Sequence, residues 1–585
     1  MATIPVVVKH QGKKYDVELD PSSLGEVFKF QLYSLTGVEP DRQKILVKGG
    51  QLKDDTDLSK IGAKPGLVIM MMGTPGDASN VLTRPKDPVK FVEDMTEAEA
   101  AQQVGATPAG LQNLGNTCYL NSTLQTLRAI PELQEQLEKY TPGPSSGPQG
   151  NTLGDLSMFG LGGVGSSMDL TASLRDLYRQ MSQTQEGFPP LAFLNALRAL
   201  FPQFAQKAKN NHGYAQQDAE EAWSQIISQL RQKLKFTETP SGDTEAKEIS
   251  FIDKFLAGKI SSVTECDEQE AKDAGEEVAK SEDAFLKLDC HIDKDTNHLK
   301  DGILAGLSEK IEKTSSVLGR DAVFTKTSRI SRLPKYLTIH FVRFFWKREA
   351  QKKAKIMRKV TFQHELDVVD FCTDELKKLI IPVRDKVREV RKDEEDVERA
   401  RKRQKRIHDK EVADKAAGIT DSVSESKKAD NKKDSEKKKD GPSKDGDTEM
   451  EDVVYKTDAE VDAERSAAVL EAKKELHAMI NPELLKDEGN NKSGLYELRG
   501  IVTHQGASAD SGHYTAYVKK LGPLDPKTGK RGEEDGNWWW FNDDKVSEVE
   551  SEKIATLAGG GESHSALILL YRALPMPTAD GLADL

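Results

Sequence analysis

The chain has 585 residues, which is long enough for about two to four domains. Its formal net charge is −12 at pH 7, with 31% charged residues, and this acidic balance disfavours nucleic-acid partners. Its four cysteines lack CxxC pairing, which argues against a disulfide framework and against a zinc site built from cysteine pairs. No apolar run reaches about 18 residues and no signal peptide opens the chain, so we expect a soluble intracellular protein without a membrane partner.

Residues 1–73 predict a small β-grasp domain. Short apolar runs with period-two alternation indicate strands, and one run has helical spacing. The stretch RQKILVKGGQLKDDTDLSKIG resembles the corresponding part of ubiquitin. The domain continues into GTPG instead of ending at a free diglycine, so we do not expect it to be conjugated. The expected strands are Ile4–Val8, Tyr15–Leu19, Lys44–Lys48 and Leu67–Met72, and the expected helix is Leu24–Leu35.

The last strand of this domain offers a candidate docking face. Alternation along the strand places Ile69 and Met71 on one face. Val68 and Met70 lie on the opposite face. We expect Ile69 and Met71, joined by Leu46, to form an exposed apolar patch for a partner, with purely local packing as the alternative.

Residues 74–106 have the composition of a flexible linker, rich in Gly, Pro, Asp, Thr and Ala. An acidic run with helical propensity, Val92–Gln103, lies within this linker. Beyond it we expect a second, larger domain over residues 107–574 and a loose tail over residues 575–585.

Cys118 lies at the start of a predicted helix, directly behind the polar turn NLGNT. Free N–H groups and the positive end of the helix dipole favour a thiolate there, and the thiolate is the nucleophilic form. The turn also gathers backbone N–H groups and the Asn113 side chain at one point, where a developing oxyanion needs donors. A buried structural cysteine is the alternative.

The stretch GLQNLGNTCYLNSTLQTL is similar to the cysteine box of the ubiquitin-specific proteases, which are papain-like cysteine deubiquitinases. The resemblance covers most of Gly110–Leu574 and implies an α+β fold of fingers, palm and thumb that needs no cofactor and no metal. Many members carry a CxxC…CxxC zinc ribbon in the fingers, which resemble Phe251–Cys290 here, and this sequence lacks that ribbon. With the ubiquitin-like domain in front, the arrangement resembles that of the proteasome-associated members.

A second polar motif, QQDAEE, opens another predicted helix. Carboxylates in a first helical turn are explained by capping alone. The resemblance implies instead that Gln217 and Asp218 line the cleft that grips the basic tail of ubiquitin, where Asp218 can pair with the tail. The resemblance assigns Tyr514 to the same cleft.

The run SRLPKYLTIHFVRFFW, residues 331–346, predicts a buried strand and matches a block of the family. His340 within this run is a candidate general base, but the apolar alternation around it favours a sheet residue. Residues 347–359 form a basic, loop-like run, and in the proteasome-associated relatives a loop here obstructs the cleft.

Residues 384–453 form a charged insert with few apolar residues, which cannot fold alone. We expect the insert to be disordered or to extend as a charged helix over Val383–Ala417, just after Pro382. Its RKRQKR run, residues 401–406, is a candidate nuclear signal, with a solvated helix face as the alternative.

The stretch THQGASADSGHYTAYVKK places His513 at the start of a strand, behind a loop of small residues. The stretch matches the family's H-x-G-x-x-x-x-x-G-H-Y box, which implies that His513 takes the thiol proton and later gives it to the leaving lysine amine. His504 in the same box is the rival, and its place inside a strand favours a packing role.

The stretch WWWFNDD should supply the third catalytic residue, which hydrogen-bonds the far side of His513 and holds its tautomer. The family position directly after the aromatic residue is Asn542, where we expect close relatives to carry Asp. Asn542 is our first choice and Asp543 the second, because asparagine orients a histidine but cannot stabilise the imidazolium by a full charge.

Together these motifs predict a thiol-dependent deubiquitinase that hydrolyses the isopeptide bond after the C-terminal glycine of ubiquitin, trims chains and recycles ubiquitin. The expected partners are ubiquitin, polyubiquitinated proteins and the regulatory particle of the 26S proteasome, which the ubiquitin-like domain would reach. We expect a monomer in the cytoplasm and nucleus. The alternative is a mainly non-catalytic, ubiquitin-reading proteasome regulator with a gated, weakly active cleft.

Overall fold

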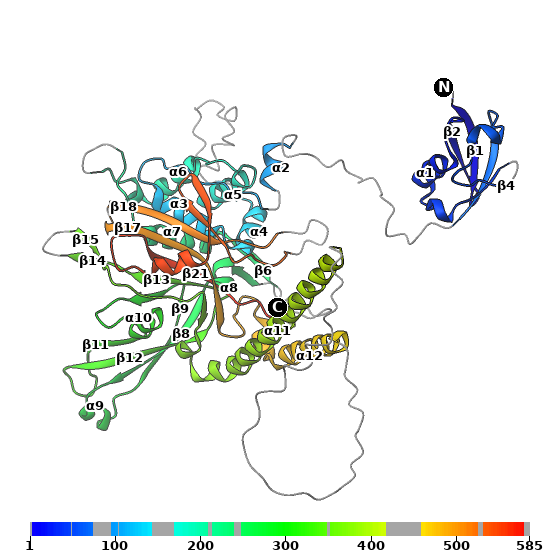
Figure 1. Cartoon of the computed structure of the whole chain (residues 1–585). Coiled ribbons are helices and arrows are strands. Elements are labelled where there is room, and N and C mark those ends of the chain that lie inside the picture. Colours follow the sequence, from blue (N-terminus) through cyan, green and yellow to red (C-terminus); the bar gives the residue numbers. More distant parts are fainter. Residues whose placement is uncertain are drawn as a thin grey trace, which may run out of the picture. The chain divides into compact units, whose positions relative to one another are not determined.

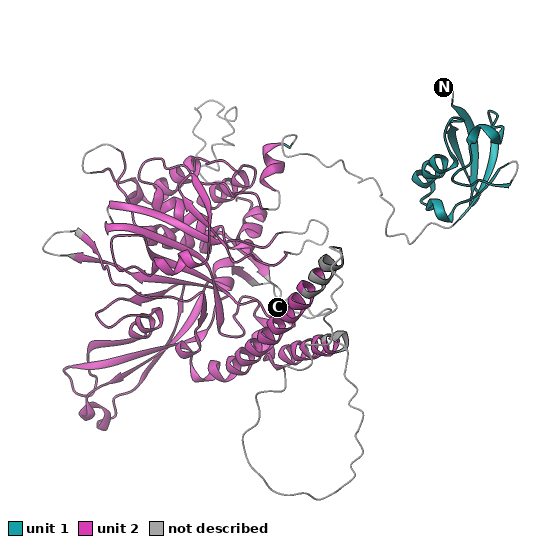
Figure 2. Ribbon diagram, viewed as in Figure 1, with its two compact units in different colours: residues 1–95 teal, residues 96–585 magenta. Residues whose placement is uncertain are grey.

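The computed structural model divides into two compact units, residues 1–95 and 96–585, which are described separately (Figure 2). The expectations for most of the linker, for the middle of the charged insert and for the end of the tail concern residues outside the described part of the chain. The described residues are 3–47, 50–73, 95–102, 105–142, 169–208, 213–238, 247–347, 352–416, 458–509, 511–523 and 531–577.

The first unit is a β-grasp in which α1 (Gly25–Thr36) packs on a mixed sheet of strand order β2-β1-β5-β3-β4 (Figure 1). β1 runs antiparallel to β2 and parallel to β5. The helix ends at Gly37, whose φ of 68° lies in the left-handed region that glycine adopts without steric cost. The strands are β1 (Ile4–His10), β2 (Lys13–Leu19), β3 (Lys44–Val47), β4 (Gly50–Gln51) and β5 (Leu67–Met72).

The exposed face of β5 is opposite to the predicted one. Ile69 and Met71 are each 2% exposed and belong to the core. Val68 and Met70 are 50% and 55% exposed, and Leu46, which pairs with Met70 across the sheet, is also exposed. The prediction was therefore wrong for Ile69 and Met71, because alternation defines two faces without saying which one the helix covers.

The second unit is built around a sheet of strand order β10-β13-β21-β17-β18-β19-β20, in which β16 also pairs with β17. β21 contributes alternate residues to two hydrophobic cores, Ile568 and Leu570 to one and Leu569 and Tyr571 to the other. Burial on both faces explains its continuous apolar sequence. The strands are β10 (Leu288–His291), β13 (Tyr336–Val342), β16 (Glu365–Asp367), β17 (Leu495–Ser508), β18 (Ser511–Lys519), β19 (Trp538–Asn542), β20 (Lys545–Val549) and β21 (Ser565–Ala573).

A helical lobe shares the first of these cores with the sheet. Every residue of α3 (Cys118–Leu127) is buried, and α3 packs against β17, β18 and α7. Capping fixes the starts of two neighbouring helices, because Asp169 caps α5 and Asp218 caps α7 through their carboxylates. The other helices of the lobe are α4 (Pro131–Lys139), α5 (Leu170–Met181), α6 (Leu191–Leu200), α7 (Ala219–Lys233) and α8 (Phe251–Phe255).

A separate antiparallel sheet of order β11-β12-β8-β9 takes β8 and β9 from the region predicted as fingers, residues 251–290, and extends beyond it with β11 and β12 (Figure 1). Within the described ranges, no group of three or more His, Cys, Asp or Glu side chains is placed to hold a metal. None of the described helices is long and apolar enough to cross a membrane. The elements of this region are β8 (Gly258–Cys266), α9 (Gln269–Asp273), β9 (Ala279–Phe285), α10 (Leu299–Gly306), β11 (Ser308–Thr314) and β12 (Asp321–Arg332).

The charged insert is entered and left by two long helices that pack against each other, α11 (Asp374–Ala416) and α12 (Asp458–Met479). α11 starts before the predicted boundary and contains Pro382. α11 confirms the helical alternative for this part of the insert, and Val387 and Val390 are fully buried, so the first turns of residues 384–453 pack into the unit and are not solvated all round. Their apolar residues recur every three or four positions, a period that average composition hides.

Ion pairs join the two helices, with Lys386 Nζ 3.0 Å from a Glu475 oxygen and Lys473 Nζ 2.6 Å from a Glu394 oxygen. The basic run at residues 401–406 lies farther along α11, where its charged side chains are exposed to solvent. This placement fits a solvated helix face.

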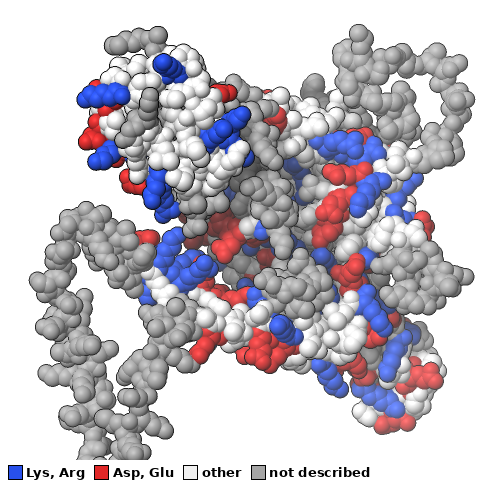
Figure 3. All heavy atoms as spheres, turned by 90° about the vertical axis from the view of Figure 1, so that its right-hand side faces the viewer, with Lys and Arg blue, Asp and Glu red and all other residues white. Residues whose placement is uncertain are grey.

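On the face shown in Figure 3, acidic and basic side chains are interspersed over the described surface.

Short elements connect the layers of the second unit. Among them is a hairpin, β14 and β15, in the region predicted as a basic loop. The short elements are α2 (Glu97–Ala101), α13 (Pro482–Lys486), α14 (Glu552–Ala555), β6 (Lys235–Glu238), β7 (Lys247–Ser250), β14 (Phe344–Lys347) and β15 (Lys352–Lys355).

Candidate active site

Cys118 is the first residue of α3, and a tight polar turn precedes it. Gly115 and Asn116 both have positive φ, 95° and 54°, so the chain makes room for N–H groups at the helix start. The thiol is 3% exposed, and burial raises the pKa of Cys118 to about 11. The predicted acidic thiol is therefore wrong for this state of the protein, because desolvation outweighs the effect of the helix end.

His513 lies on β18, the strand against which the cysteine helix packs. Its Nε2 is 2.6 Å from Oδ1 of Asn542, the last residue of β19. An amide oxygen only accepts hydrogen bonds, so Nε2 carries the hydrogen and Nδ1 keeps a lone pair. The next residue, Tyr514, donates its backbone N–H to the Cys118 sulfur, so the start of β18 lies at the thiol.

Asp543, the alternative third residue, contacts the cysteine segment instead of His513. Its two carboxylate oxygens accept hydrogen bonds from Asn121 Nδ2 at 2.8 Å and from Asn113 Nδ2 at 3.0 Å. Its backbone carbonyl accepts a third from Leu111 N–H at 2.9 Å. The φ of Asp543 is 53°, a left-handed conformation that turns its side chain away from the strand. The geometry therefore separates the two candidates, with Asn542 in contact with His513 and Asp543 in contact with the turn before Cys118.

Two family models match the chain. The model described as ubiquitin carboxyl-terminal hydrolase matches residues 109–571, and that of the ubiquitin family matches residues 6–76. Ubiquitin carboxyl-terminal hydrolase 6 of Schizosaccharomyces pombe is 41% identical over 97% of this chain and 99% of its own length. The chain belongs to the ubiquitin carboxyl-terminal hydrolase family.

Two further relatives match over nearly the full length of this hydrolase. Ubiquitin carboxyl-terminal hydrolase 6 of Arabidopsis thaliana is 37% identical over 97% of this chain and 98% of its own. Ubiquitin carboxyl-terminal hydrolase 14 of Caenorhabditis elegans is 32% identical over 97% of this chain and 94% of its own. The hydrolase is thus a cysteine-dependent deubiquitinase with an N-terminal ubiquitin-like domain and an α+β fold.

Asn113 is held rigidly in the turn before the catalytic helix of this hydrolase. Its Oδ1 accepts hydrogen bonds from the backbone N–H groups of Gly115 at 3.0 Å and Thr117 at 3.2 Å. One hydrogen of its Nδ2 is given to Asp543. An amide nitrogen carries two hydrogens, so the second is available for an oxyanion.

Tyr514 does not line the cleft surface. Its side chain is fully buried, and its ring packs edge-to-face on His504 at a centroid distance of 4.6 Å. The prediction that its side chain contacts the ubiquitin tail is therefore wrong for this conformation. Alternation along β18 turns the side chain of its neighbour His513 toward the opposite face.

Asp218 lies at the start of α7 and is already engaged. Its Oδ1 caps the helix through Glu220 N–H at 2.9 Å, and Lys353 Nζ of β15 lies 3.8 Å from its Oδ2. Lys353 Nζ also donates to Glu221 Oε1 at 2.9 Å. Burial raises the pKa of Asp218, and the ammonium of Lys353 partly offsets this rise. Gln217, next to it, is half-buried.

Two histidines considered as rival bases have structural contacts. His504 is fully buried between Phe344 and Tyr514, and burial lowers its pKa to about 3. His340 lies on β13 with its Nδ1 2.8 Å from Asp289 Oδ1. Both are packed sheet residues, in agreement with the apolar alternation around them.

Sequence reasoning missed Asn121 and Lys353. Asn121 lies on the buried face of α3, one turn after Cys118, and a polar residue on a buried helix face is the signal that points to a hidden partner. Lys353 is one lysine in a basic run, and nothing in the sequence singles it out. Its importance comes from the hairpin that carries it to α7.

Proposed function

We propose that Cys118, His513 and Asn542 form the catalytic centre of this deubiquitinase. His513 Nδ1 takes the proton of the Cys118 thiol as the sulfur attacks the carbonyl carbon of ubiquitin's terminal glycine. The oxyanion that forms accepts hydrogen bonds from Asn113 Nδ2 and from the Cys118 backbone N–H. Asn542 holds the imidazole so that Nδ1 faces the thiol.

The tetrahedral intermediate formed by this attack then breaks down. The bond between the glycine carbonyl carbon and the lysine nitrogen breaks, and His513 gives its proton to the departing amine. The product is a thioester between Cys118 and ubiquitin. His513 next takes a proton from water as the water oxygen attacks the thioester carbon. The bond between that carbon and the Cys118 sulfur then breaks, and His513 returns the proton to the sulfur, which releases free ubiquitin with its C-terminal carboxylate and restores the thiol.

The observation that carries this assignment is the 2.6 Å hydrogen bond between His513 and Asn542 on the strands beside the buried Cys118. The test is labelling with a ubiquitin that carries a thiol-reactive C-terminal warhead. We expect labelling of the full chain and of Cys266→Ala, a buried cysteine of the fingers, and none of Cys118→Ala. Equal labelling of Cys118→Ala would overturn the nucleophile.

We further propose that the ubiquitin-like unit docks on the 26S proteasome through Leu46, Val68 and Met70, and that the enzyme works in the cytoplasm and nucleus on proteasome-bound conjugates. The support is an exposed apolar face on a domain fused to a deubiquitinase. Met70→Glu should abolish capture by purified proteasome. Val27→Glu on α1, whose residue is 57% exposed, is the matched control and should retain capture.

A second reading, a gated and weakly active enzyme, is favoured by the hairpin β14–β15. Its Lys353 forms ion pairs with Asp218 and Glu221, the acidic residues to which we assign the basic tail of ubiquitin. Ser508 Oγ of β17 donates to the Lys353 carbonyl at 2.7 Å, so two segments beside the site are joined. Proteasome should then raise turnover far more than it raises ubiquitin binding. Equal turnover with and without proteasome would exclude this reading.

A further inference from the structure

A second histidine, His564, lies beside the proposed base. It directly precedes β21 and is half-buried. Its ring centroid is 6.3 Å from that of His513, and the two ring planes meet at 72°. This is an edge-to-face contact, an arrangement that neighbouring aromatic rings prefer. His564 has no task in the mechanism proposed above, so its place at the catalytic ring needs a separate explanation.

His564 and Asn542 contact His513 from opposite sides of its strand. The order of neighbouring strands in the main sheet is β21-β17-β18-β19. Asn542, on β19, holds the imidazole through the 2.6 Å hydrogen bond to Nε2. His564 comes from beyond β17, because the next residue, Ser565, pairs with His504 of β17. The imidazole of His513 therefore has one neighbour from each side of β18.

A short row of polar side chains anchors His564 in this position. Its Nδ1 lies 3.2 Å from Thr503 Oγ1 on β17. Thr503 is fully buried, and its hydroxyl lies 2.8 Å from Thr515 Oγ1 on β18. Thr515 follows His513 by two positions, so the two side chains share one face of the strand. The row thus ties His564 to the strand that carries the base.

His564 is an uncharged neighbour at neutral pH. Burial lowers its pKa to about 4, and the nearby His513, Lys355 and Lys553 add to this effect. A neutral ring can pack against both protonation states of His513, whereas a second imidazolium would repel the one that forms during catalysis. Asn542 is also uncharged, so both neighbours supply orientation and neither supplies a full charge.

We propose that His564 is a positioning residue for the deubiquitinase reaction, which packs against His513 and limits the rotation of its imidazole. The hydrogen bond from Asn542 fixes one atom of the ring, and a ring held at one atom can still turn about it. A packed neighbour removes this freedom and keeps Nδ1 aimed at the thiol. This inference rests on the proposed catalytic centre, because His564 acts only through His513.

The test is steady-state hydrolysis of a fluorogenic ubiquitin by the full chain. His564→Ala should lower kcat about 2- to 12-fold with little change in KM, the range in which an edge-to-face ring contact contributes. His564→Phe keeps a ring and loses the contact with Thr503, so it should retain most of the wild-type kcat. Unchanged kcat in His564→Ala would overturn the proposal. An equal loss in the Ala and Phe variants would assign the effect to Thr503 and would refute positioning by ring packing.

A double-mutant cycle separates positioning from a general loss of packing. Asn542→Asp holds the histidine by a charge-assisted hydrogen bond, which is stronger than the bond from the amide. His564→Ala should therefore lower kcat less in the Asn542→Asp background than in wild type. Equal losses in both backgrounds would mean that His564 acts on the fold as a whole, against the proposal.

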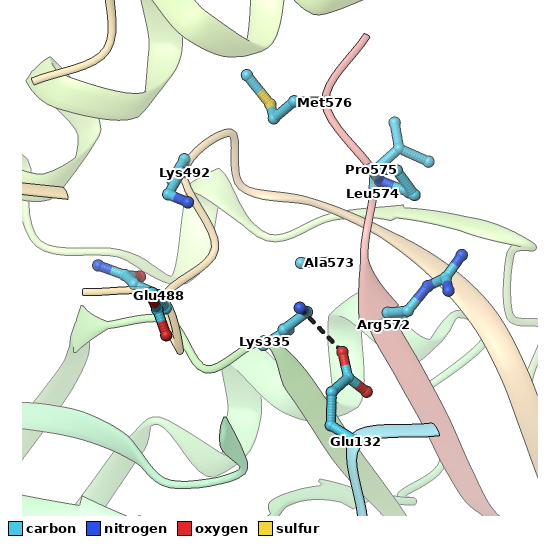
Figure 4. Close-up of a pocket in the computed structure, with 10 residues that line it drawn as sticks. Glu132, Lys335, Glu488, Lys492, Arg572, Ala573, Leu574, Pro575 and Met576 are labelled. Atoms are coloured by element: carbon cyan, nitrogen blue, oxygen red, sulfur yellow. Dashed lines mark ion pairs between the residues drawn. The ribbon is translucent and has the colours of Figure 1, made fainter. Parts of the chain in front are cut away.

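A control variant at the other end of β21 measures the effect of destabilisation alone. Glu132 of α4 lines a cavity of about 150 Å³ there, together with Ala573, the last residue of β21 (Figure 4). Its carboxylate lies 2.9 Å from Lys335 Nζ and also accepts the hydroxyl of the buried Tyr336. Glu132→Ala leaves that hydroxyl without its acceptor, so it should lower the melting temperature and leave kcat unchanged. A kcat as low as that of His564→Ala would attribute both losses to destabilisation and would sink the positioning role.

His513→Ala keeps this test apart from the test of the catalytic centre. Its turnover should fall to background, because it removes the proposed base. Full activity of His513→Ala would refute the base and the positioning role together. Full activity of His564→Ala alone would refute only the positioning role. His291→Ala, which removes an exposed histidine of β10, should behave like wild type.

Discussion

Asp543 Oδ1 accepts a hydrogen bond of 2.8 Å from Asn121 Nδ2, although 422 positions separate the two residues in the chain. The other oxygen of the same carboxylate holds Asn113 at 3.0 Å. One side chain at the end of β19 thus fixes both the helix that begins at Cys118 and the turn in front of it. The C-terminal part of the chain therefore holds the proposed oxyanion donor Asn113 in place and also supplies the proposed base, His513.

Asp543→Ala should lower kcat about 10- to 100-fold with a smaller change in KM, because Asn113 loses the partner that aims it at the oxyanion. It should also lower the free energy of unfolding by about 0.5–1.5 kcal/mol, since the buried Asn121 amide loses its shortest hydrogen bond and keeps only those to the Leu111 and Gln112 carbonyls. Steady-state kinetics and urea unfolding measure the two effects. Asp544→Ala, which removes an exposed neighbour, should leave both unchanged.

Asn542→Ala should lower kcat/KM by about two orders of magnitude, the range of a displaced general base. Asn542→Asp keeps the acceptor facing His513 Nε2 and adds a charge that stabilises the imidazolium, so its activity should equal or exceed that of wild type. Hydrolysis of a fluorogenic ubiquitin measures both variants. Full activity of Asn542→Ala would mean that a residue other than Asn542 orients the His513 imidazole.

Alkylation of Cys118 in the enzyme alone should be slow at pH 7 and should rise about tenfold per pH unit up to pH 10. The reason is that burial raises the pKa of this thiol to about 11, so the thiolate fraction grows with pH across this whole window. Mass spectrometry of iodoacetamide-treated protein gives the rate at each pH. The unfolded chain is the control, where the rate should level off above about pH 8.5. A folded-state rate that is already constant near pH 7 would contradict the buried neutral thiol.

Lys353→Met should raise kcat/KM of the isolated enzyme about two- to fivefold, mainly through KM. The variant frees Asp218 and Glu221 from a partly exposed ion pair worth about 0.2–1 kcal/mol. Lys353→Glu should act more strongly, because a carboxylate there repels both acidic residues. Lys310→Met, an exposed lysine of the fingers, is the matched control. Unchanged KM in both Lys353 variants would argue against a tail site at α7.

Val387→Ala should lower the free energy of unfolding of the second unit by about 1–3 kcal/mol, from lost apolar burial and the cavity left behind. The residue lies in the stretch that composition marks as external, yet it is fully buried in the core that α11 completes. Arg403→Ala, on the exposed part of the same helix, should change stability little. Chemical unfolding followed by tryptophan fluorescence compares the variants.

The elements with strong local patterns were predictable. The strands of the ubiquitin-like domain and the helix at Cys118 each carry their own periodicity. The buried face of β5 and the buried turns of α11 were mispredicted, because each depends on which neighbour covers the element. The Cys118 pKa was mispredicted for the same reason, since the degree of burial is a property of the packed fold.

The sequence by itself determined the family and predicted the nucleophile and the base, because short motifs at fixed local spacing carry that information. Only the tertiary structure decided between Asn542 and Asp543, which are adjacent in the chain and differ in what their backbone turns them toward. It also brought Lys353 to Asp218. Contacts of this kind join segments more than a hundred residues apart, so no local pattern encodes them.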